Sequence, residues 1–274
     1  MHHSPMSENH IERLQGMHVV RSGPPHAPPL LLIHGSGASG DTWNPMVPAL
    51  AARHHVIRVD LPGCGHSPPA PSYEVPAQAG RVAAMLDGLG LRDVTAAGHS
   101  SGGYVATALA ERRPDLVRSL ALISTGPSLD ALLPQPPILK LLLGPPLGAL
   151  VWPVRSDAMI RKGIRATTAR PVDLSDELVA GVKAISYRSF REIARRNTEY
   201  LDERSLPARL TALDVPVLVV FGAADPRWEP SSARRYDAVP NAQVEMLPGI
   251  GHLPLLEDPE ATSGLLLRFA DAYR

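Results

Sequence analysis

A five-residue pattern between a predicted strand and a predicted helix constrains the fold of this chain more than any other feature. Residues 93–97 are apolar and partly β-branched, which is typical of a buried strand, and residues 103–113 have the composition of a helix. Between them stands Gly98-His99-Ser100-Ser101-Gly102. A G-x-S-x-G pattern in this position predicts a sharp turn that raises the Ser100 hydroxyl above the edge of a sheet. Because its two glycines have no Cβ, strand and helix can approach each other closely.

The histidines restrict where a base for this serine can lie. A serine hydroxyl is a weak nucleophile until a neighbouring base takes its proton. Ten of the eleven histidines precede Ser100, and only His252 follows it. In folds with this turn, the partners follow the serine in the order acid, then histidine. The sequence therefore predicts His252 as the base, in a glycine-rich loop after a short strand at 243–247.

Two aspartates are candidates for the acid that orients this histidine. Asp225 follows the apolar run 217–221, which predicts a strand buried on both faces. Polar groups at the carboxyl ends of such strands face the ligand site of open α/β sheets. Asp130 follows the predicted strand 120–124 and stays open as the alternative. We expect Asp225 to be the acid.

A glycine-rich turn near the start of the chain supplies a third element. The apolar strand 29–33 runs into His34-Gly35-Ser36-Gly37. Attack on a carbonyl creates an oxyanion that converging backbone N–H groups must stabilise. We expect these donors to be the N–H groups of Ser36 and Ser101. Phosphate binding is disfavoured, because the turn lacks the Gly-Lys-Ser/Thr ending of a P-loop.

Together these motifs resemble the α/β-hydrolase superfamily, in particular its small, cofactor-free bacterial members. The resemblance implies a mostly parallel, eight-stranded sheet with helices on both faces and a helical cap inserted after strand six. It implies one domain over residues 1–274, with the cap at about 126–210. Epoxide hydrolases and haloalkane dehalogenases carry aspartate where this chain has Ser100, so the resemblance disfavours those activities. The matching segments are His34-Gly35-Ser36-Gly37, residues 60–67, the pattern around Ser100, Asp225, and residues 251–254 with 257–259.

The expected chemistry is hydrolysis of a carboxylic ester, lactone or thioester by Ser100, His252 and Asp225 through an acyl-enzyme. Two alternatives stay open. One is carbon–carbon bond hydrolysis of a β-diketone-like substrate, and the other is a non-catalytic ligand sensor that retains the triad. No metal or organic cofactor is expected, because no clustered ligand spacing appears.

Substrate choice is expected to lie mainly in the cap, where residues 131–154 are apolar apart from Lys140. Six prolines argue against a membrane span there, and docking to a membrane surface is the less favoured alternative. The arginines at 188, 191, 195 and 196 predict a solvated helix face, with carboxylate binding as the alternative. Trp228 is expected near the site, with a packing role as the alternative. The predicted pocket residues are Gly37, His99, Leu141, Leu143, Leu147, Trp152 and Trp228.

The amino-acid composition restricts which binding partners and which cellular compartment are expected. The 27 basic and 27 acidic residues balance, so no charge signature for nucleic acid is present. The lone cysteine, Cys64, excludes an intrachain disulfide, and residues 1–28 lack the apolar core of a signal peptide. We therefore expect a cytoplasmic protein whose partner is a small-molecule substrate, with a homodimer left open. Residues 11–21, divided at Gly16, predict a hairpin that leads into the sheet.

Overall fold

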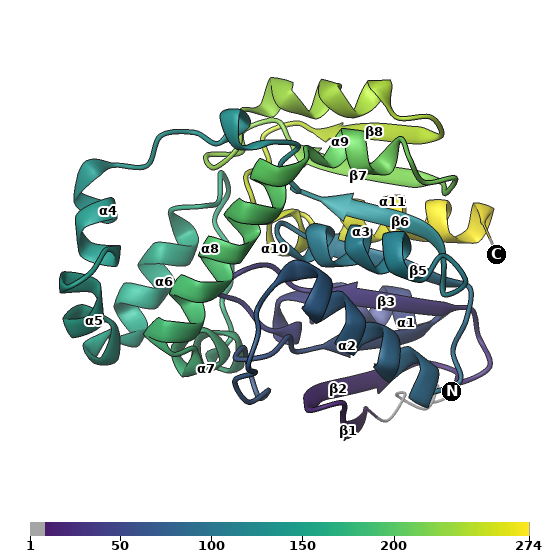
Figure 1. Ribbon diagram of the computed structural model, residues 1–274, viewed down its shortest axis with the longest axis horizontal. Helices are drawn as coiled ribbons and strands as arrows, with labels where there is room; N and C mark the ends of the chain where they lie inside the picture. The colour runs from purple at the N-terminus through teal and green to yellow at the C-terminus, as the bar shows by residue number, and fades with distance from the viewer. Residues whose placement is uncertain (1–8, 274) are drawn as a thin grey trace, which may run out of the picture.

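The computed structural model describes residues 9–273, which form an eight-stranded sheet in the order β1-β2-β4-β3-β5-β6-β7-β8 (Figure 1). Only β2 runs against its neighbours; it pairs antiparallel with both β1 and β4, and every other pair is parallel. The predicted mostly parallel sheet and the hairpin are therefore confirmed. The strands are β1 (His10–Leu14), β2 (Met17–Ser22), β3 (Pro29–Ile33), β4 (His55–Val59), β5 (Val94–His99), β6 (Val117–Ile123), β7 (Val217–Gly222) and β8 (Ala242–Leu247).

Helices cover both faces of the sheet, because successive residues of a strand point to opposite sides. Leu31 and Ile33 of β3 pack into one core, and Leu30 and Leu32 pack into the other. The first core includes residues of α2 and α3, and the second includes residues of α1 and α11. The helices outside the insertion described next are η1 (Gly40–Trp43), α1 (Val47–Ala51), α2 (Val75–Gly88), α3 (Gly102–Arg112), α9 (Leu206–Leu210), η4 (Pro230–Ala238), α10 (Pro254–Glu257) and α11 (Pro259–Ala272).

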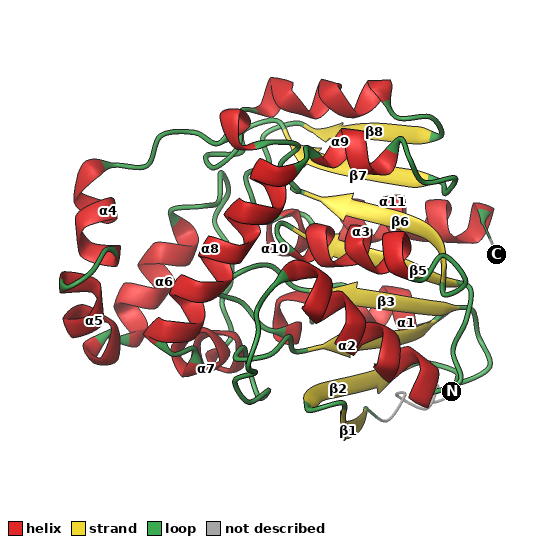
Figure 2. Cartoon of the chain, in the orientation of Figure 1, coloured by secondary structure: helices red, strands yellow, loops and turns green. Residues whose placement is uncertain are grey.

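Between β6 and β7 the chain leaves the sheet and, over residues 129–203, forms a run of helices, hereafter the insertion. Figure 2 shows it beyond the arrowheads of the parallel strands, with α4 and α5 farthest from the sheet. Its own small core joins Ile160, Val172, Leu174, Leu178 and Val179. None of the helices in residues 9–273 is both long and apolar enough to cross a membrane. The insertion contains η2 (Leu129–Ala131), α4 (Pro137–Leu143), α5 (Leu147–Val151), η3 (Trp152–Val154), α6 (Asp157–Arg165), α7 (Asp176–Ala184) and α8 (Tyr187–Glu203).

Candidate active site

Ser100 occupies the sharp turn between β5 and α3, with a φ of 52°. A serine rarely adopts this left-handed conformation, so the surrounding structure must hold it there. The Ser100 N–H donates to the Ile123 carbonyl (2.8 Å). A Cβ on Gly98 would lie 2.4 Å from the backbone of Gly102, and one on Gly102 would lie 2.3 Å from the Ile33 carbonyl oxygen. Both glycines of the pattern are therefore required by close backbone packing.

Three side chains that are far apart in sequence form one chain of contacts at the carboxyl edge of the sheet. Nε2 of His252 lies 3.1 Å from the Ser100 hydroxyl oxygen, and Nδ1 lies 2.8 Å from an Asp225 carboxylate oxygen. Because a carboxylate can only accept, this contact places the imidazole proton on Nδ1 and leaves Nε2 free to accept from Ser100. His252 and Asp225 are both buried, at 4% and 3% exposure. The arrangement can remove a proton from the Ser100 hydroxyl.

The structure distinguishes the two candidate acids. The second oxygen of Asp225 accepts from the N–H groups of Arg227 (2.7 Å) and Trp228 (3.2 Å), which hold the carboxylate in place. Asp130 is exposed and forms a two-point ion pair with Arg235, at 2.9 and 2.7 Å. Asp225 is therefore the carboxylate that contacts His252.

The backbone on both sides of His252 is held by a buried carboxylate, that of Glu257. It accepts from the N–H groups of Gly251 (2.9 Å) and Leu253 (3.1 Å), and also from Ala169 (2.7 Å) in the insertion. The His252 N–H donates to the Thr167 carbonyl at 2.9 Å. The insertion and the histidine loop therefore fix each other. The sequence predicted no role for Glu257, although a carboxylate shortly after a glycine-rich loop is a signal for one.

His99, the residue before the serine, supports the same loop from behind. Its Nε2 donates to the His252 carbonyl oxygen (2.8 Å), and the two rings lie 5.2 Å apart. Burial lowers the pKa of His99 to about 3, and the neighbouring His252 adds to the shift. His99 is therefore neutral at physiological pH, and it positions the main chain of His252.

The two residues predicted to bind an oxyanion lie side by side. The hydroxyl oxygens of Ser36 and Ser101 are 2.8 Å apart, and Asn197 of α8 donates its side-chain N–H to Ser36 (2.8 Å). His34, two residues before Ser36, accepts the Leu61 N–H on Nε2 at 2.9 Å and is buried, which lowers its pKa. The sequence does not single out Asn197, because nothing in an arginine-rich helix marks one asparagine as facing the site.

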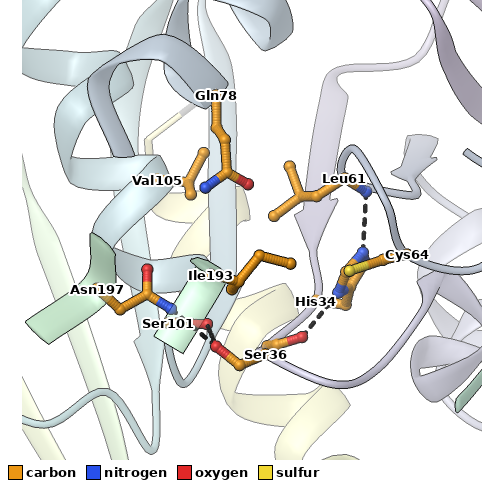
Figure 3. A pocket seen from close by; sticks show the side chains of 10 residues that line it. His34, Ser36, Leu61, Cys64, Gln78, Ser101, Val105, Ile193 and Asn197 are labelled. Atoms are coloured by element: carbon orange, nitrogen blue, oxygen red, sulfur yellow. Dashed lines mark hydrogen bonds between the residues drawn. The ribbon is translucent and has the colours of Figure 1, made fainter. Parts of the chain in front are cut away.

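A narrow cleft lies beside Ser36 and Ser101 (Figure 3). Its walls come from the loops after β3 and β4 and from helices α2, α3 and α8. Burial raises the pKa of the Cys64 thiol in this wall to about 12, so the thiol stays protonated and unreactive. The lining residues are His34, Gly35, Ser36, Leu61, Cys64, Gln78, Ser101, Val105, Ile193 and Asn197.

None of the pocket residues predicted from the sequence lines this cleft. Leu141 is 61% exposed on α4, and Leu143 and Leu147 are partly buried. Trp152 stacks on Phe190 with ring centroids 4.4 Å apart, and a Cβ on Gly37 would lie 3.9 Å from that phenylalanine. Trp228 is buried against Gly126, which fits the packing alternative.

Two arginines of α8, Arg195 and Arg196, pair with acidic neighbours, whereas Arg188 and Arg191 are exposed. Arg195 and Arg196 both pair with Glu192 and Glu199, and Arg196 also reaches Glu74 on the N-terminal side of α2 at 3.0 Å. These contacts favour the solvated-face interpretation over carboxylate binding.

Comparison with known proteins identifies the family of this chain. A family model described as the alpha/beta hydrolase family matches residues 30–265, so the chain belongs to that family. Within it, the chain is an esterase-type hydrolase. A pimeloyl-[acyl-carrier protein] methyl ester esterase of Neisseria meningitidis serogroup C is 31% identical over 257 residues, which cover 92% of this chain and 96% of that protein.

Two solved structures extend the comparison. Carboxylesterase CesB (YbfK) from Bacillus subtilis is 25% identical, with a TM-score of 0.77, and the match covers 96% of this chain and 91% of that one. A membrane phospholipase A, described as a bacterial virulence factor, is 28% identical with a TM-score of 0.77 and coverage of 98% and 87%.

Proposed function

We propose that this protein is a serine hydrolase that cleaves a carboxylic ester, lactone or thioester of a small apolar substrate. The observation that carries the proposal is the line of contacts from the Ser100 hydroxyl to His252 (3.1 Å) and from His252 to Asp225 (2.8 Å). The relative named as a methyl ester esterase and the solved carboxylesterase support ester chemistry.

In the proposed first half-reaction, the Ser100 oxygen attacks the substrate carbonyl carbon while Nε2 of His252 takes the hydroxyl proton. Asp225 keeps the imidazole in the required tautomer and stabilises the imidazolium that forms. The N–H groups of Ser36 and Ser101 stabilise the oxyanion. When the tetrahedral intermediate collapses, the bond to the leaving oxygen or sulfur breaks, and His252 gives its proton to the departing alcohol or thiol.

The second half-reaction releases the acid. Water attacks the acyl group on Ser100 while His252 takes a proton from it, and collapse returns that proton to the Ser100 oxygen. Every proton moves through groups of the chain itself, so the proposal includes no metal or organic cofactor. A cytoplasmic location and a small-molecule partner belong to the same proposal.

Hydrolysis of p-nitrophenyl acetate and butyrate tests this function. We expect Ser100→Ala to lower kcat at least about 10³-fold, because the nucleophile is removed. Ser231→Ala is the matched control on an exposed serine, and it should leave kcat unchanged. Absence of turnover by the wild-type protein would favour a ligand sensor. Turnover of vinylogous diketones without any ester cleavage would favour carbon–carbon hydrolysis.

A further inference from the structure

Glu257 is buried, at 9% exposure, where the insertion packs on the loop between β8 and α10, which is the histidine loop. Its Oε2 accepts three backbone N–H groups, from Gly251 at 2.9 Å, Ala169 at 2.7 Å and Arg170 at 3.1 Å. Its Oε1 accepts a fourth, from Leu253 at 3.1 Å. An ionised carboxylate accepts at about four lone-pair positions, so these donors use its full capacity. One side chain therefore joins two segments that are 88 residues apart in sequence.

The same segment of the insertion also touches the backbone of the histidine loop directly. The Thr167 carbonyl accepts the N–H of His252 at 2.9 Å. A Cβ on Gly251 would lie 2.6 Å from the Ala169 nitrogen and 3.0 Å from the Thr167 carbonyl oxygen, so no side chain fits between the two backbones. The segment around Thr167 and Ala169 is therefore packed against the main chain that carries the imidazole.

The sheet supports Ser100 and His252 unequally. Ser100 follows β5, which is buried throughout, whereas the histidine loop follows β8, an edge strand with half-buried or exposed residues. A strand that is packed on both faces fixes the residue after it more firmly, because a close-packed interior allows little movement. On the sheet side, His99 donates to the His252 carbonyl oxygen at 2.8 Å. The contacts from the insertion therefore add support that β8 does not give.

We propose that Glu257 is a positioning residue for catalysis, through which the placement of His252 depends on the insertion. This inference rests on the proposed hydrolase function. Nε2 of His252 lies 3.1 Å from the Ser100 hydroxyl oxygen, at the long end of the hydrogen-bond range, so a small shift of the loop breaks this contact. Glu257 prevents the shift by holding the backbone on both sides of His252, and it takes no part in bond breaking. Moving the segment around Ala169 should then slow the reaction without changing the contacts with the substrate.

Two substitutions of Glu257 test this role on p-nitrophenyl acetate. In Glu257→Gln the amide oxygen can stay on the Oε2 side and keep three contacts, while the amide nitrogen faces the Leu253 N–H; Glu257→Met loses all four. We expect kcat to fall about tenfold in Glu257→Gln and about 100-fold in Glu257→Met, the range for a misplaced catalytic group, with KM within about twofold of wild type. Glu260→Gln is the matched control on an exposed glutamate of α11, and it should keep the wild-type kcat.

Labelling with an excess of a fluorophosphonate separates positioning from folding. The final amount of label counts the chains with a folded site, whereas the initial rate depends on proton transfer from Ser100 to His252. In both Glu257 variants we expect one label per chain at the end of the reaction and a reduced initial rate. A role in folding alone would lower the final amount of label and leave kcat per labelled chain at the wild-type value, which would overturn the proposal.

Gly251→Ala disturbs the same junction from the other side and replaces Glu257→Met if that variant does not fold. Its Cβ would press on the Ala169 nitrogen, so we expect kcat to fall at least about tenfold with KM kept. Gly163→Ala, at an exposed position of the insertion, is the matched control and should leave kcat unchanged. A wild-type kcat in the Glu257 and Gly251 variants overturns the positioning role alone. A wild-type protein that cleaves no ester overturns the proposed function as well.

Discussion

The carboxyl edge of the sheet and the insertion between β6 and β7 are stabilised in different ways. At the edge, β3, β5 and β7 are buried almost completely, and Ser100 and Asp225 lie just after β5 and β7. His252 lies after β8, whose residues are half-buried or exposed. On the insertion, Leu141, Leu150 and Val154 are 61, 71 and 74% exposed. The edge therefore tolerates little change, whereas the outer insertion has a surface that can vary without disturbing the reacting groups.

The two regions nevertheless meet at a few defined contacts. Asn197 bonds Ser36, Ile193 lines the cleft, and Thr167 accepts the N–H of His252. The inner side of the insertion thus shapes the site, and its outer side does not.

The largest contrast lies between the two aspartates. Asp225→Asn should lower kcat about 10⁴-fold, because an amide in place of the carboxylate favours the wrong imidazole tautomer. Asp130→Asn removes only an exposed pair with Arg235, and its kcat should stay within about twofold of wild type. Steady-state kinetics on p-nitrophenyl butyrate measure both. Equal losses in the two variants would contradict the assignment of the acid.

Truncating a buried leucine should lower the free energy of unfolding far more than truncating an exposed one. Leu31→Ala removes a fully buried side chain from β3 and should lower the free energy of unfolding by about 2–5 kcal/mol. Leu150→Ala, at a position 71% exposed, should change it by less than about 0.5 kcal/mol. Urea denaturation followed by circular dichroism compares them. A similar loss at Leu150 would show that a partner covers this face of the insertion.

The pH dependence of the free energy of unfolding tests whether His99, behind the site, is neutral. Its pKa of about 3 in the folded protein lies below the ordinary value of 6.5, so the unfolded chain binds the proton more readily. The stability that the neutral imidazole of His99 contributes is therefore complete above about pH 6.5 and is lost as the pH falls toward 3. Between pH 7 and pH 5 the loss is about 2 kcal/mol.

The variant His99→Asn should therefore lose less stability than wild type on acidification from pH 7 to pH 5. The exposed His26→Asn should behave like wild type. Urea denaturation at the two pH values measures the difference. An acid-induced loss that is the same in all three proteins would contradict the neutral, buried state of His99.

The smallest effect is expected at a glycine of the insertion. Gly163 is exposed within α6, and a Cβ there meets nothing within 4 Å. Gly163→Ala should raise the free energy of unfolding by about 0.5–1 kcal/mol, because alanine is the better helix former. The same change at Gly102 should destabilise, since its Cβ would lie 2.3 Å from the Ile33 oxygen. Thermal denaturation should give a melting temperature above that of wild type for Gly163→Ala and below it for Gly102→Ala.

The sequence predicted the mostly parallel sheet and the sharp turn at Ser100, whereas it did not indicate which residues line the cleft, for a physical reason. Gly98, Ser100 and Gly102 act within one turn, so a local pattern contains their geometry, and chain order was enough to single out His252. The cleft depends instead on contacts between distant segments: Asn197 reaches Ser36 across 161 residues of sequence. The apolar run around Leu141 predicted a pocket wall, but an apolar stretch alone does not reveal which of its sides faces the protein.

The central claim, that Ser100 is the nucleophile, is tested most directly by labelling with a fluorophosphonate and locating the adduct by peptide mass spectrometry. If Ser100 is the nucleophile, one adduct per chain forms on the peptide that contains Ser100, and none forms in Ser100→Ala. An adduct on another serine, or equal labelling of wild type and variant, would contradict it.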